Sequence, residues 1–189
     1  MTRINLNKYD QVKEKSVGGG CLTGSIRDNM NDSNELCDVI KLISQNALII
    51  WVSNGKWSTH ELLTSLLNIT GPASVHISSY ALSEKPTRQL ILLKDAGLIT
   101  ELYCVIDNRV DTRTAGTLQI IKSICDDYAL IDTHAKVTVI TNGNWSIAVI
   151  GSANYTENKR YESGVIICTP AAAAFSIKWI EKALKDGVK

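Results

Sequence analysis

The chain has 189 residues, a formal net charge of +1, 44% hydrophobic residues and 21% charged residues. This length suits one compact domain, and the composition is that of an ordinary globular protein, so nothing in it calls for a metal or a disulfide framework to fold. A charge near zero excludes the strongly basic surface of many nucleic-acid binders, although a local basic cleft is compatible with it.

Residues 1–33 are predicted to form a flexible N-terminal arm, and residues 34–189 the folded domain. The arm is polar, contains Gly18-Gly19-Gly20 and has no sustained hydrophobic period. Its lysines and arginines slightly outnumber its acidic residues. We interpret it as a solvated tail, with contact to a phosphate backbone or to a partner subunit as the alternative.

Helix-like and strand-like segments alternate after the arm. Helices are expected at 35–45, 58–68, 86–96 and 112–125, and strands at 47–52, 73–80, 99–106 and 129–131. The continuous apolar run 47–52 is typical of a strand that is buried on both faces. This order predicts an α/β fold with a mixed, largely parallel sheet that is flanked by helices on both faces.

The pattern changes near the C-terminal third of the chain. Two β-rich runs, 135–141 and 145–150, are separated by Asn142-Gly143-Asn144. Asn-Gly between alternating apolar runs is the strongest short-range signal of a hairpin. One more strand is expected at 162–168 and an amphipathic helix at 170–185. The sequence thus predicts a C-terminal β-hairpin followed by a strand and a helix.

The five cysteines are scattered and odd in number, and none forms a C-x-x-C pair. Several stand in apolar segments, so we interpret them as small buried residues of a reducing compartment rather than as zinc ligands or disulfides. The first residues lack the apolar core of a secretory signal. No apolar run approaches the roughly 20 residues of a membrane span. We therefore expect a cytoplasmic protein.

The hairpin predicts a cluster of polar side chains at its open end. Residues i and i+2 of a strand share a face, so His134 and Lys136 are expected to project together. With a three-residue turn, His134 lies opposite Ser152 and Lys136 opposite Ile150, within one register step. Asn154 follows close by, so residues far apart in the sequence are expected to form one site.

These residue types suit a phosphate ester. The ammonium of Lys136 supplies a point charge for a phosphoryl oxygen, and Ser152 and Asn154 supply neutral donors. The imidazole of His134 can attack phosphorus or, when protonated, donate a proton to a leaving alkoxide. A carboxylate is needed to hold the other ring nitrogen, and Glu162, at the start of the following strand, is the candidate for this role.

The same residues resemble the H-x-K-x-x-x-x-D and G-S-x-N signature of the phospholipase D superfamily, and the short, single-motif nuclease branch is the most similar. The matching stretches are His134-Ala135-Lys136, Gly151-Ser152-Ala153-Asn154-Tyr155-Thr156 and the strand that begins at Glu162. The resemblance covers about residues 130–168. It implies a metal-independent phosphodiesterase without a cofactor. In it, His134 forms a phosphohistidine, Lys136, Ser152 and Asn154 bind the phosphate, and Glu162 orients the histidine.

One position departs from the signature, because Thr141 stands where the family has an aspartate. In the resemblance that aspartate is more structural than chemical, and some nuclease members lack it. Every group assigned to phosphorus is kept. A degenerate, inactive member of the family is the alternative that this departure leaves open.

The chain contains a single H-x-K, since His60 and His76 are followed by other residues. The family's chemistry uses two histidines, so the resemblance implies a homodimer with the active site at the subunit interface. We expect an endonuclease that cleaves DNA. The alternatives are a phospholipid hydrolase or transferase with the same site, and a non-catalytic phospholipase D-like binding domain.

Other polar and aromatic residues have plainer interpretations. His60 is expected to cap or decorate a helix, and His76 to be a buried histidine with its hydrogen bonds satisfied. The four tryptophans are expected to anchor the core or an interface. The aspartates between 107 and 132 fit no template for metal ligands and are assigned to turns and helix ends. Lys159-Arg160 is assigned either to a phosphate flanking the scissile bond or to a solvated loop.

Overall fold

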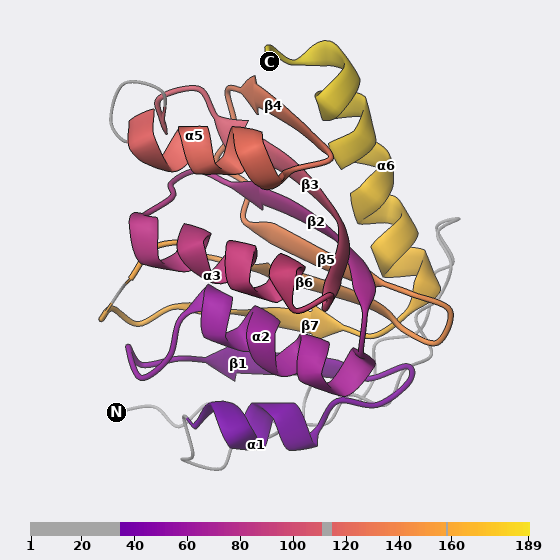
Figure 1. Cartoon of the computed structure of the whole chain (residues 1–189). Helices are drawn as coiled ribbons and strands as arrows, with labels where there is room; N and C mark the ends of the chain where they lie inside the picture. The colour runs from indigo at the N-terminus through magenta and orange to yellow at the C-terminus, as the bar shows by residue number, and fades with distance from the viewer. Residues whose placement is uncertain (1–34, 111–114, 158) are drawn as a thin grey trace, which may run out of the picture.

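The structure is a computed structural model that describes residues 35–110, 115–157 and 159–189 (Figure 1). The predicted arm lies outside the described residues, so the division at residue 33 stays a prediction. The helices are α1 Leu36–Lys41, α2 Thr59–Thr70, α3 Glu84–Asp95, α5 Ala115–Ile124 and α6 Pro170–Asp186. The strands are β1 Leu48–Val52, β2 Ala73–Ser79, β3 Ile99–Asp107, β4 Asp127–Ile131, β5 Val137–Thr141, β6 Ser146–Gly151 and β7 Ser163–Ile167.

The strands form one mixed sheet in the order β1-β7-β6-β5-β2-β3-β4. The pairs β2–β3 and β3–β4 are parallel, and the pairs that join β1, β7, β6, β5 and β2 are antiparallel. Strands β1, β2, β3, β4 and β6 therefore run in one direction, and β5 and β7 run against them. The expected α/β class and mixed sheet are confirmed. Parallel neighbours are confined to one side because the hairpin strand β5 lies beside β2.

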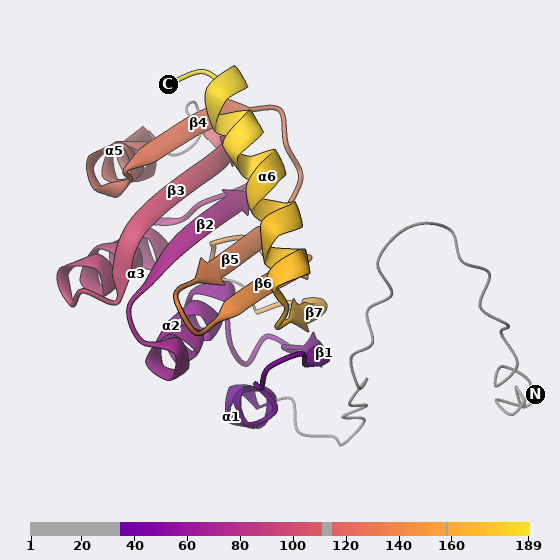
Figure 2. The ribbon, with the colours of Figure 1, turned by 90° about the vertical axis from the view of Figure 1, so that its right-hand side faces the viewer.

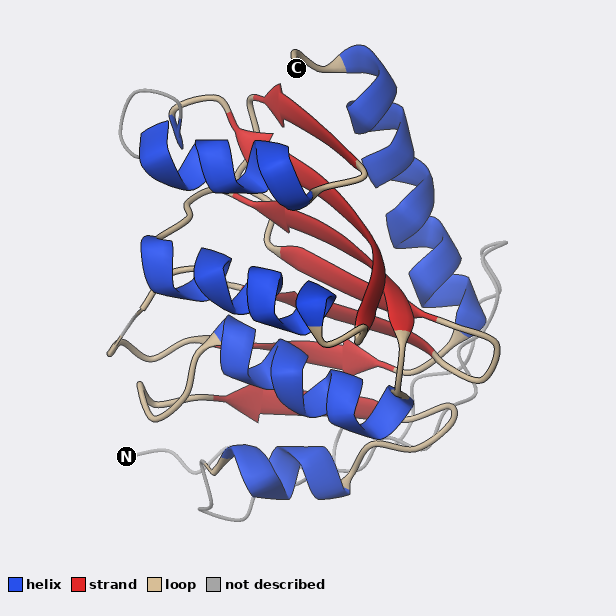
Figure 3. Cartoon of the chain, viewed as in Figure 1, coloured by secondary structure: helices blue, strands red, loops and turns tan. Residues whose placement is uncertain are grey.

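Helices cover both faces of this sheet, as predicted. Figures 1 and 2 show α1, α2, α3 and α5 on one face and α6 lying across the other; Figure 3 shows the same layers by element type. The larger core lies under the first group of helices and includes Leu66 and Leu102. A second core lies under α6 and includes Val105, Val139 and Ile180.

Helix α2 illustrates how local sequence sets an element that borders the site. Ser58 and Glu61 form a reciprocal capping box, in which the Ser58 backbone N–H donates to the Glu61 carboxylate at 2.8 Å. Leu62, Leu63 and Leu66 are buried, so one face of the helix packs on the sheet. The predicted start of this helix is confirmed.

Strand β1 differs from the expectation for the run 47–52. It lies at an edge of the sheet, and its burial alternates. Ile49 and Trp51 are buried, whereas Ile50 is 57% exposed and Val52 is 39% exposed. The expectation of burial on both faces is wrong because α6 does not extend over β1 (Figure 2).

The hairpin forms where it was predicted, with its register one step away from the expected one. The Asn142 backbone N–H donates to the Trp145 carbonyl at 3.0 Å, so the turn has two central residues. The Asn142 side chain accepts from the backbone N–H groups of Asn144 and Trp145 at 2.9 and 2.8 Å. This local hydrogen bonding stabilises the tighter turn. Thr141 consequently pairs with Ser146.

The described cysteines are all free thiols. Cys104 and Cys168 are buried, as expected of small apolar residues, and burial raises the pKa of Cys168 to about 11. Cys37 is exposed, in contrast to that expectation. Cys21 lies outside the described residues.

Candidate active site at one edge of the sheet

The predicted site residues gather at the edge of the sheet that is formed by the ends of its strands. His134 and Lys136 precede β5, Ser152 and Asn154 follow β6, and Glu162 precedes β7. Because β5 and β7 run against β6, their starts lie beside its end. The carboxyl ends of β2, β3 and β4 are at this same edge, which is where open α/β sheets bind ligands.

His134 and Lys136 lie together, although not through the period of a strand. Strand β5 begins at Val137, so both residues belong to the preceding loop. The Nζ of Lys136 is 3.1 Å from Nδ1 of His134 and donates to the His134 carbonyl at 2.6 Å. The expected pairing of an ammonium with an imidazole is present. Lys136 is opposite Gly151, whose N–H donates to the Lys136 carbonyl at 3.2 Å, and not opposite Ile150.

The ammonium of Lys136 has neutral partners in direct contact. Burial lowers its pKa, and the charges of Glu162 and Asp107 act in the opposite direction. Within the described part of the chain, its hydrogen bonds are to the imidazole and the carbonyl of His134, and no carboxylate binds it directly. Such a cation is well suited to receive an anionic oxygen.

Ser152 and Glu162 are joined directly. The Ser152 hydroxyl donates to the Glu162 carboxylate and accepts from the Ser163 backbone N–H at 3.1 Å. The described hydrogen bond of Glu162 is thus to the serine of the second motif. Its expected contact with His134 stays a prediction.

Asn154 is anchored through its side-chain oxygen. This oxygen accepts from the Ala81 backbone N–H at 3.1 Å and from the Ser79 hydroxyl at 3.4 Å. The amide nitrogen is therefore the atom that can donate to a substrate. The next residue, Tyr155, is buried, and its hydroxyl lies 2.7 Å from Thr138 Oγ1, which fixes the loop from below.

Glycines allow a close approach of the backbone beside the site. A Cβ on Gly151 would lie 2.8 Å from the Ser163 carbonyl oxygen and 3.0 Å from Cζ2 of Trp51. A Cβ on Gly164 would collide with the Ile150 carbonyl oxygen. The ring of Trp51 therefore packs across two glycines that have no room for a side chain.

Thr141 lies away from this edge. It is the last residue of β5, beside the hairpin turn, and pairs with Ser146 and Ser74. It is five positions after Lys136, or about 16 Å along an extended strand. The position at which the signature's aspartate is replaced is thus at the far end of β5 from the site residues.

Three further residues near His134 were not among the predicted site residues. The Tyr80 ring is 4.6 Å from the His134 ring, centroid to centroid, and Arg109 Cζ is 4.7 Å from the Tyr80 centroid. Asp107 is fully buried and binds Arg109 through two hydrogen bonds of 2.6 and 2.8 Å. Tyr80 and Asp107 stand at or beside the ends of predicted parallel strands, and that placement is the sequence signal that could have found them.

Asp107 also holds the loop that carries His134. Its carboxylate accepts from the Thr133 backbone N–H at 3.1 Å. Arg109 is the main cause that lowers the pKa of Asp107 to about 2, and the buried carboxylate raises the pKa of Arg109 in turn. This ion pair has a structural role, because it supports the loop that carries His134.

The predicted turn or helix-end placement holds for Asp126 and Asp132, which lie in bends, and is wrong for Asp107 and Asp127, which are terminal residues of β3 and β4. Asp126 accepts from the Leu102 backbone N–H at 2.8 Å, and Asp132 lies 3.3 Å from Arg109. Asp111 is outside the described residues. Within the described ranges, no group of three histidine, cysteine, aspartate or glutamate side chains is placed to hold a metal ion.

The two remaining histidines are both buried. Nδ1 of His60 lies 2.7 Å from the Ser58 hydroxyl at the start of α2, in keeping with its predicted place on a helix. His76 stacks on Tyr103 with ring centroids 4.5 Å apart. Its Nδ1 has no hydrogen-bond partner among the described residues, so the expectation of a satisfied histidine is wrong. Burial lowers the pKa of both histidines.

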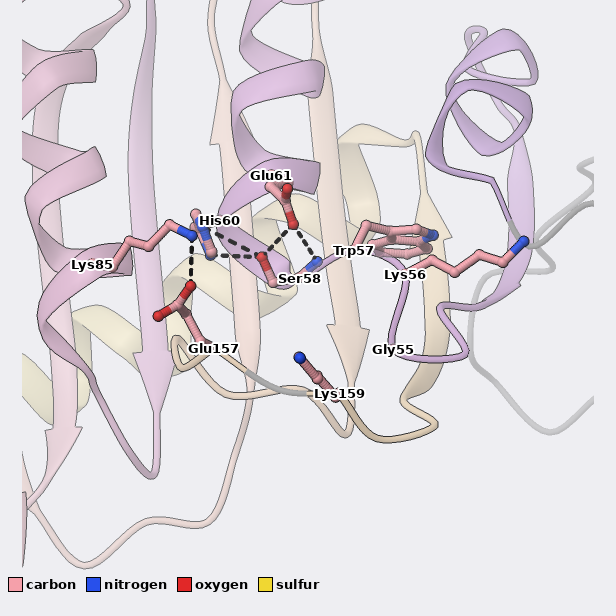
Figure 4. Close-up of a pocket in the computed structure, with 9 residues that line it drawn as sticks. All are labelled: Gly55, Lys56, Trp57, Ser58, His60, Glu61, Lys85, Glu157 and Lys159. Carbon is pink, nitrogen blue, oxygen red and sulfur yellow. Dashed lines mark hydrogen bonds and ion pairs between the residues drawn. The ribbon is translucent and has the colours of Figure 1, made fainter.

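A hollow of about 300 Å³ lies beside the start of α2 (Figure 4). Figure 4 shows the side chains of Lys56, Lys85 and Lys159 around it. Lys85 pairs with Glu157 at 2.5 Å, and both ends of this pair are exposed. Two lysines of the hollow are paired with acidic residues, Lys85 with Glu157 and Lys56 with Glu35.

Trp51 and Trp57 are buried and in contact, with ring centroids 4.9 Å apart, while Trp145 and Trp179 are partly buried against the two cores. Their predicted role as core anchors is confirmed. None of the described helices combines the length and apolar character that a bilayer crossing requires.

No protein-family model and no curated protein matches the chain. Solved structures do. Nuc from Salmonella typhimurium, a phospholipase D family member, aligns with a TM-score of 0.59 and 20% identity over 74% of this chain and 95% of that chain. NucT from Helicobacter pylori aligns with a TM-score of 0.58 and 18% identity over 75% and 97%. TrmBL2, an archaeal chromatin protein, aligns with a TM-score of 0.51 and 12% identity over 74% and 54%.

These likenesses cover nearly the full length of Nuc and NucT and about three quarters of this chain. The motif resemblance read from the sequence and the fold therefore agree. The chain has the fold of the phospholipase D family, in its compact form seen in Nuc and NucT.

Proposed function

We propose that this protein is a metal-independent phosphodiesterase of the phospholipase D superfamily, and that it is an endonuclease that cleaves DNA. The observation that carries this proposal is the meeting of His134, Lys136, Ser152, Asn154 and Glu162 at one edge of a sheet whose fold is that of Nuc. A nucleophile, a cation and two neutral donors are the groups that phosphoryl transfer requires.

The first chemical step begins when a substrate phosphate draws the ammonium of Lys136 away from Nδ1 of His134. A ring nitrogen then attacks phosphorus, an N–P bond forms, and the P–O bond of the ester breaks. The leaving alkoxide takes a proton from the imidazolium of a second histidine. The Asn154 amide donates to the oxygens on which negative charge increases, and Ser152 joins it once its hydroxyl proton leaves Glu162 for a phosphate oxygen.

The second step returns the enzyme to its starting state. Water attacks the phosphohistidine and gives its proton to the second imidazole. The N–P bond breaks, which releases a phosphate monoester and a neutral His134. Glu162, now bound to Ser152, is proposed to hold a histidine ring nitrogen during this cycle.

The second histidine is proposed to be His134 of the partner subunit. The described surface supports this, because an apolar patch lies on the side of the sheet that α6 leaves open. It consists of Ile50, Val52 and Ile150, and Val165 lies between the two isoleucines in the sheet. The patch ends beside Ser152, so a second copy that covers it comes close to the site.

The test is turnover in the presence of a chelator. Purified protein is incubated with plasmid DNA and, separately, with bis(p-nitrophenyl) phosphate, both in excess EDTA. We expect cleavage of both substrates, and loss of both activities in His134→Asn, with the far-UV spectrum and Tm unchanged because His134 is exposed. Lys178→Asn on α6 is the control that keeps activity. Cleavage that persists in His134→Asn contradicts the nucleophile assignment.

A non-catalytic nucleic-acid-binding domain is the second candidate. Two observations favour it: Thr141 replaces the signature's aspartate, and the structure of TrmBL2, to which the fold is similar, shows a novel mode of DNA binding. Retention of the plasmid in a gel shift without hydrolysis of either substrate supports this candidate. Release of headgroups from phospholipid vesicles, without DNA cleavage, supports a phospholipid hydrolase instead.

A further inference from the structure

The ring of His134 needs an anchor that its own backbone does not supply. It stands in a loop three residues before β5, so the ladder of the sheet does not set its direction. The loop itself is held by Asp107, which binds the Thr133 backbone N–H, and by Ser78, whose hydroxyl donates to the Ala135 carbonyl at 3.4 Å. These contacts fix the backbone around His134 and leave the imidazole free to rotate.

Tyr80 supplies a contact to the ring itself. It follows the last residue of β2, and its ring meets that of His134 at 4.6 Å and 49°. This tilted geometry is a favoured one for aromatic pairs. Lys136 Nζ lies 5.2 Å from the same Tyr80 centroid, so the aromatic ring contacts both residues of the H-x-K motif.

Tyr80 is in turn held by a cation. Arg109 Cζ lies 4.7 Å from its centroid, and the Arg109 guanidinium is fixed by the buried carboxylate of Asp107. The same carboxylate binds the backbone next to His134. Asp107 is therefore linked to His134 in two ways. Arg109 and Tyr80 connect it to the imidazole, and Thr133 connects it to the backbone next to His134.

The neighbours of Tyr80 reach the second motif. Ser79 and Ala81 both donate to the side-chain oxygen of Asn154. The three-residue segment 79–81 thus contacts the nucleophile loop with its central side chain and the phosphate-binding loop with its flanking residues. The end of the buried strand β2 therefore contacts both halves of the site.

We propose that Tyr80 is a positioning residue, which holds the imidazole of His134 at the angle required for attack on phosphorus, with the Arg109–Asp107 pair as its support. The inference rests on the proposed function for its catalytic consequence. The contact between the two rings is independent of it. An aromatic ring is required because it packs against the imidazole and attracts the cations of Lys136 and Arg109 at the same time.

Nuclear magnetic resonance tests the contact without any substrate. The chain has only three histidines, so the imidazole signals are assignable with His60→Gln and His76→Gln. We expect Tyr80→Leu to shift the ring-proton signals of His134 and to broaden them, and Tyr80→Phe to leave them in place. Signals of His134 that are the same in Tyr80→Leu and in the wild type overturn the inference, whether or not the protein has activity.

Kinetics with bis(p-nitrophenyl) phosphate test the consequence. We expect Tyr80→Leu to lower kcat by about 10- to 100-fold with little change in KM, because small displacements of a reacting group cost rates of this order. Tyr80→Phe is expected to restore kcat to within about 3-fold, since the ring and not the hydroxyl makes the contact. The pH–rate profile of Tyr80→Leu is expected to shift along with its kcat.

Tyr128→Leu is the matched control. Tyr128 is also a partly buried tyrosine that lies under a cation, with Lys122 Nζ 5.5 Å from its centroid, but it is on β4. It should lose comparable stability and keep kcat and the pH profile. Equal loss of kcat in Tyr80→Leu and Tyr128→Leu, or equal loss in Tyr80→Phe and Tyr80→Leu, contradicts a positioning role. An inactive wild-type protein contradicts the proposed function. The spectroscopic result then decides by itself whether Tyr80 contacts the His134 ring.

Discussion

At the scale of single residues, the site combines groups that are held firmly with groups that remain free to act. The side-chain oxygen of Asn154 accepts a hydrogen bond from a residue that follows β2, and the Ser152 hydroxyl donates its proton to Glu162. Among the described residues, the hydrogen bonds of Lys136 Nζ are to the ring and the carbonyl of His134. The cation is therefore the group that a phosphate can recruit at the smallest cost in existing interactions.

Replacing Lys136 tests this assignment. We expect Lys136→Met to lower kcat/KM for a diester by about 100- to 1,000-fold, the size seen when one preorganised transition-state donor is removed. Stability should be retained, because the methionine keeps the aliphatic part of the side chain. The measurement is steady-state kinetics alongside thermal unfolding. Activity within a few-fold of the wild type contradicts the role of Lys136 as phosphate ligand.

Asp107 gives the molecule an acid-sensitive ion pair. The pKa of its carboxyl is about 2 in the folded protein, below the ordinary value of 3.8. Its stabilising contribution is therefore fully present above about pH 4 and is lost as the pH falls toward 2. We expect Asp107→Asn to be less stable than the wild type at pH 7 and to show a smaller loss between pH 4 and 2. Parallel urea denaturation curves at several pH values measure both effects.

His76 acts in a higher pH range and with the same sign. Burial lowers its pKa below 6.5, and the nearby Glu181 and Glu101 counteract this only in part. As the pH falls below 6.5, the unfolded chain binds a proton before the folded chain does, so stability decreases. We expect His76→Phe, which keeps the stack on Tyr103, to flatten the stability curve between pH 7 and 5. An unchanged slope contradicts the assignment, while His60 accounts for any slope that remains.

At the scale of elements, the start of α2 is set by one short motif. Ser58 caps the helix and exchanges hydrogen bonds with Glu61, and the helix begins one residue later, next to Ala153 of the candidate site. The motif is local, so it was recognisable from sequence spacing alone. Its energetic weight is that of an ordinary N-cap.

Ser58→Ala should lower the free energy of unfolding by about 1 kcal/mol, within the range of roughly 0.5–2 known for such caps. Ser123→Ala is the control, because Ser123 is exposed and its hydroxyl donates only to the Ile120 carbonyl of its own helix. Chemical denaturation of the two variants measures the difference. Equal stability of both variants contradicts the capping role of Ser58.

At the scale of the whole molecule, helices α1, α2, α3 and α5 cover one face of the sheet, and α6 leaves part of the other face uncovered. Helix α6 covers the centre of its face, and the patch of Ile50, Val52 and Ile150 remains exposed beside the candidate site. Leu92 on α3 is similarly exposed, at 60%, on the opposite side of the sheet. These two surfaces offer a direct comparison for the proposed homodimer.

Ile50→Asp is expected to convert a dimer into monomers and to lower turnover by at least about 10-fold, because a buried charge is costly in an apolar interface. Leu92→Asp is expected to keep both the dimer and the activity. Sedimentation equilibrium together with turnover of bis(p-nitrophenyl) phosphate reads out the result. A wild-type protein that is monomeric and fully active excludes the two-subunit site.

Much of the fold was predictable because its signals are local. The apolar runs of β2 and β3, the capping box of α2 and the Asn142-Gly143 turn depend on neighbours within a few residues. One wrong prediction, the three-residue hairpin turn, is local, because the hydrogen bonds of the Asn142 side chain stabilise a tighter turn. Two others are tertiary. The exposure of Ile50 depends on where α6 ends, and the unsatisfied His76 depends on what packs above β2.

The sequence by itself determined the α/β class, the hairpin and the residue types of the candidate site, because helix caps, turn chemistry and hydrophobic periods act over short distances. Only the tertiary structure decided which groups meet at that site. Strand order brought Tyr80, Arg109 and Asp107 to His134 from the ends of β2 and β3. These contacts join residues that are distant along the chain, and the packing of the folded sheet creates them.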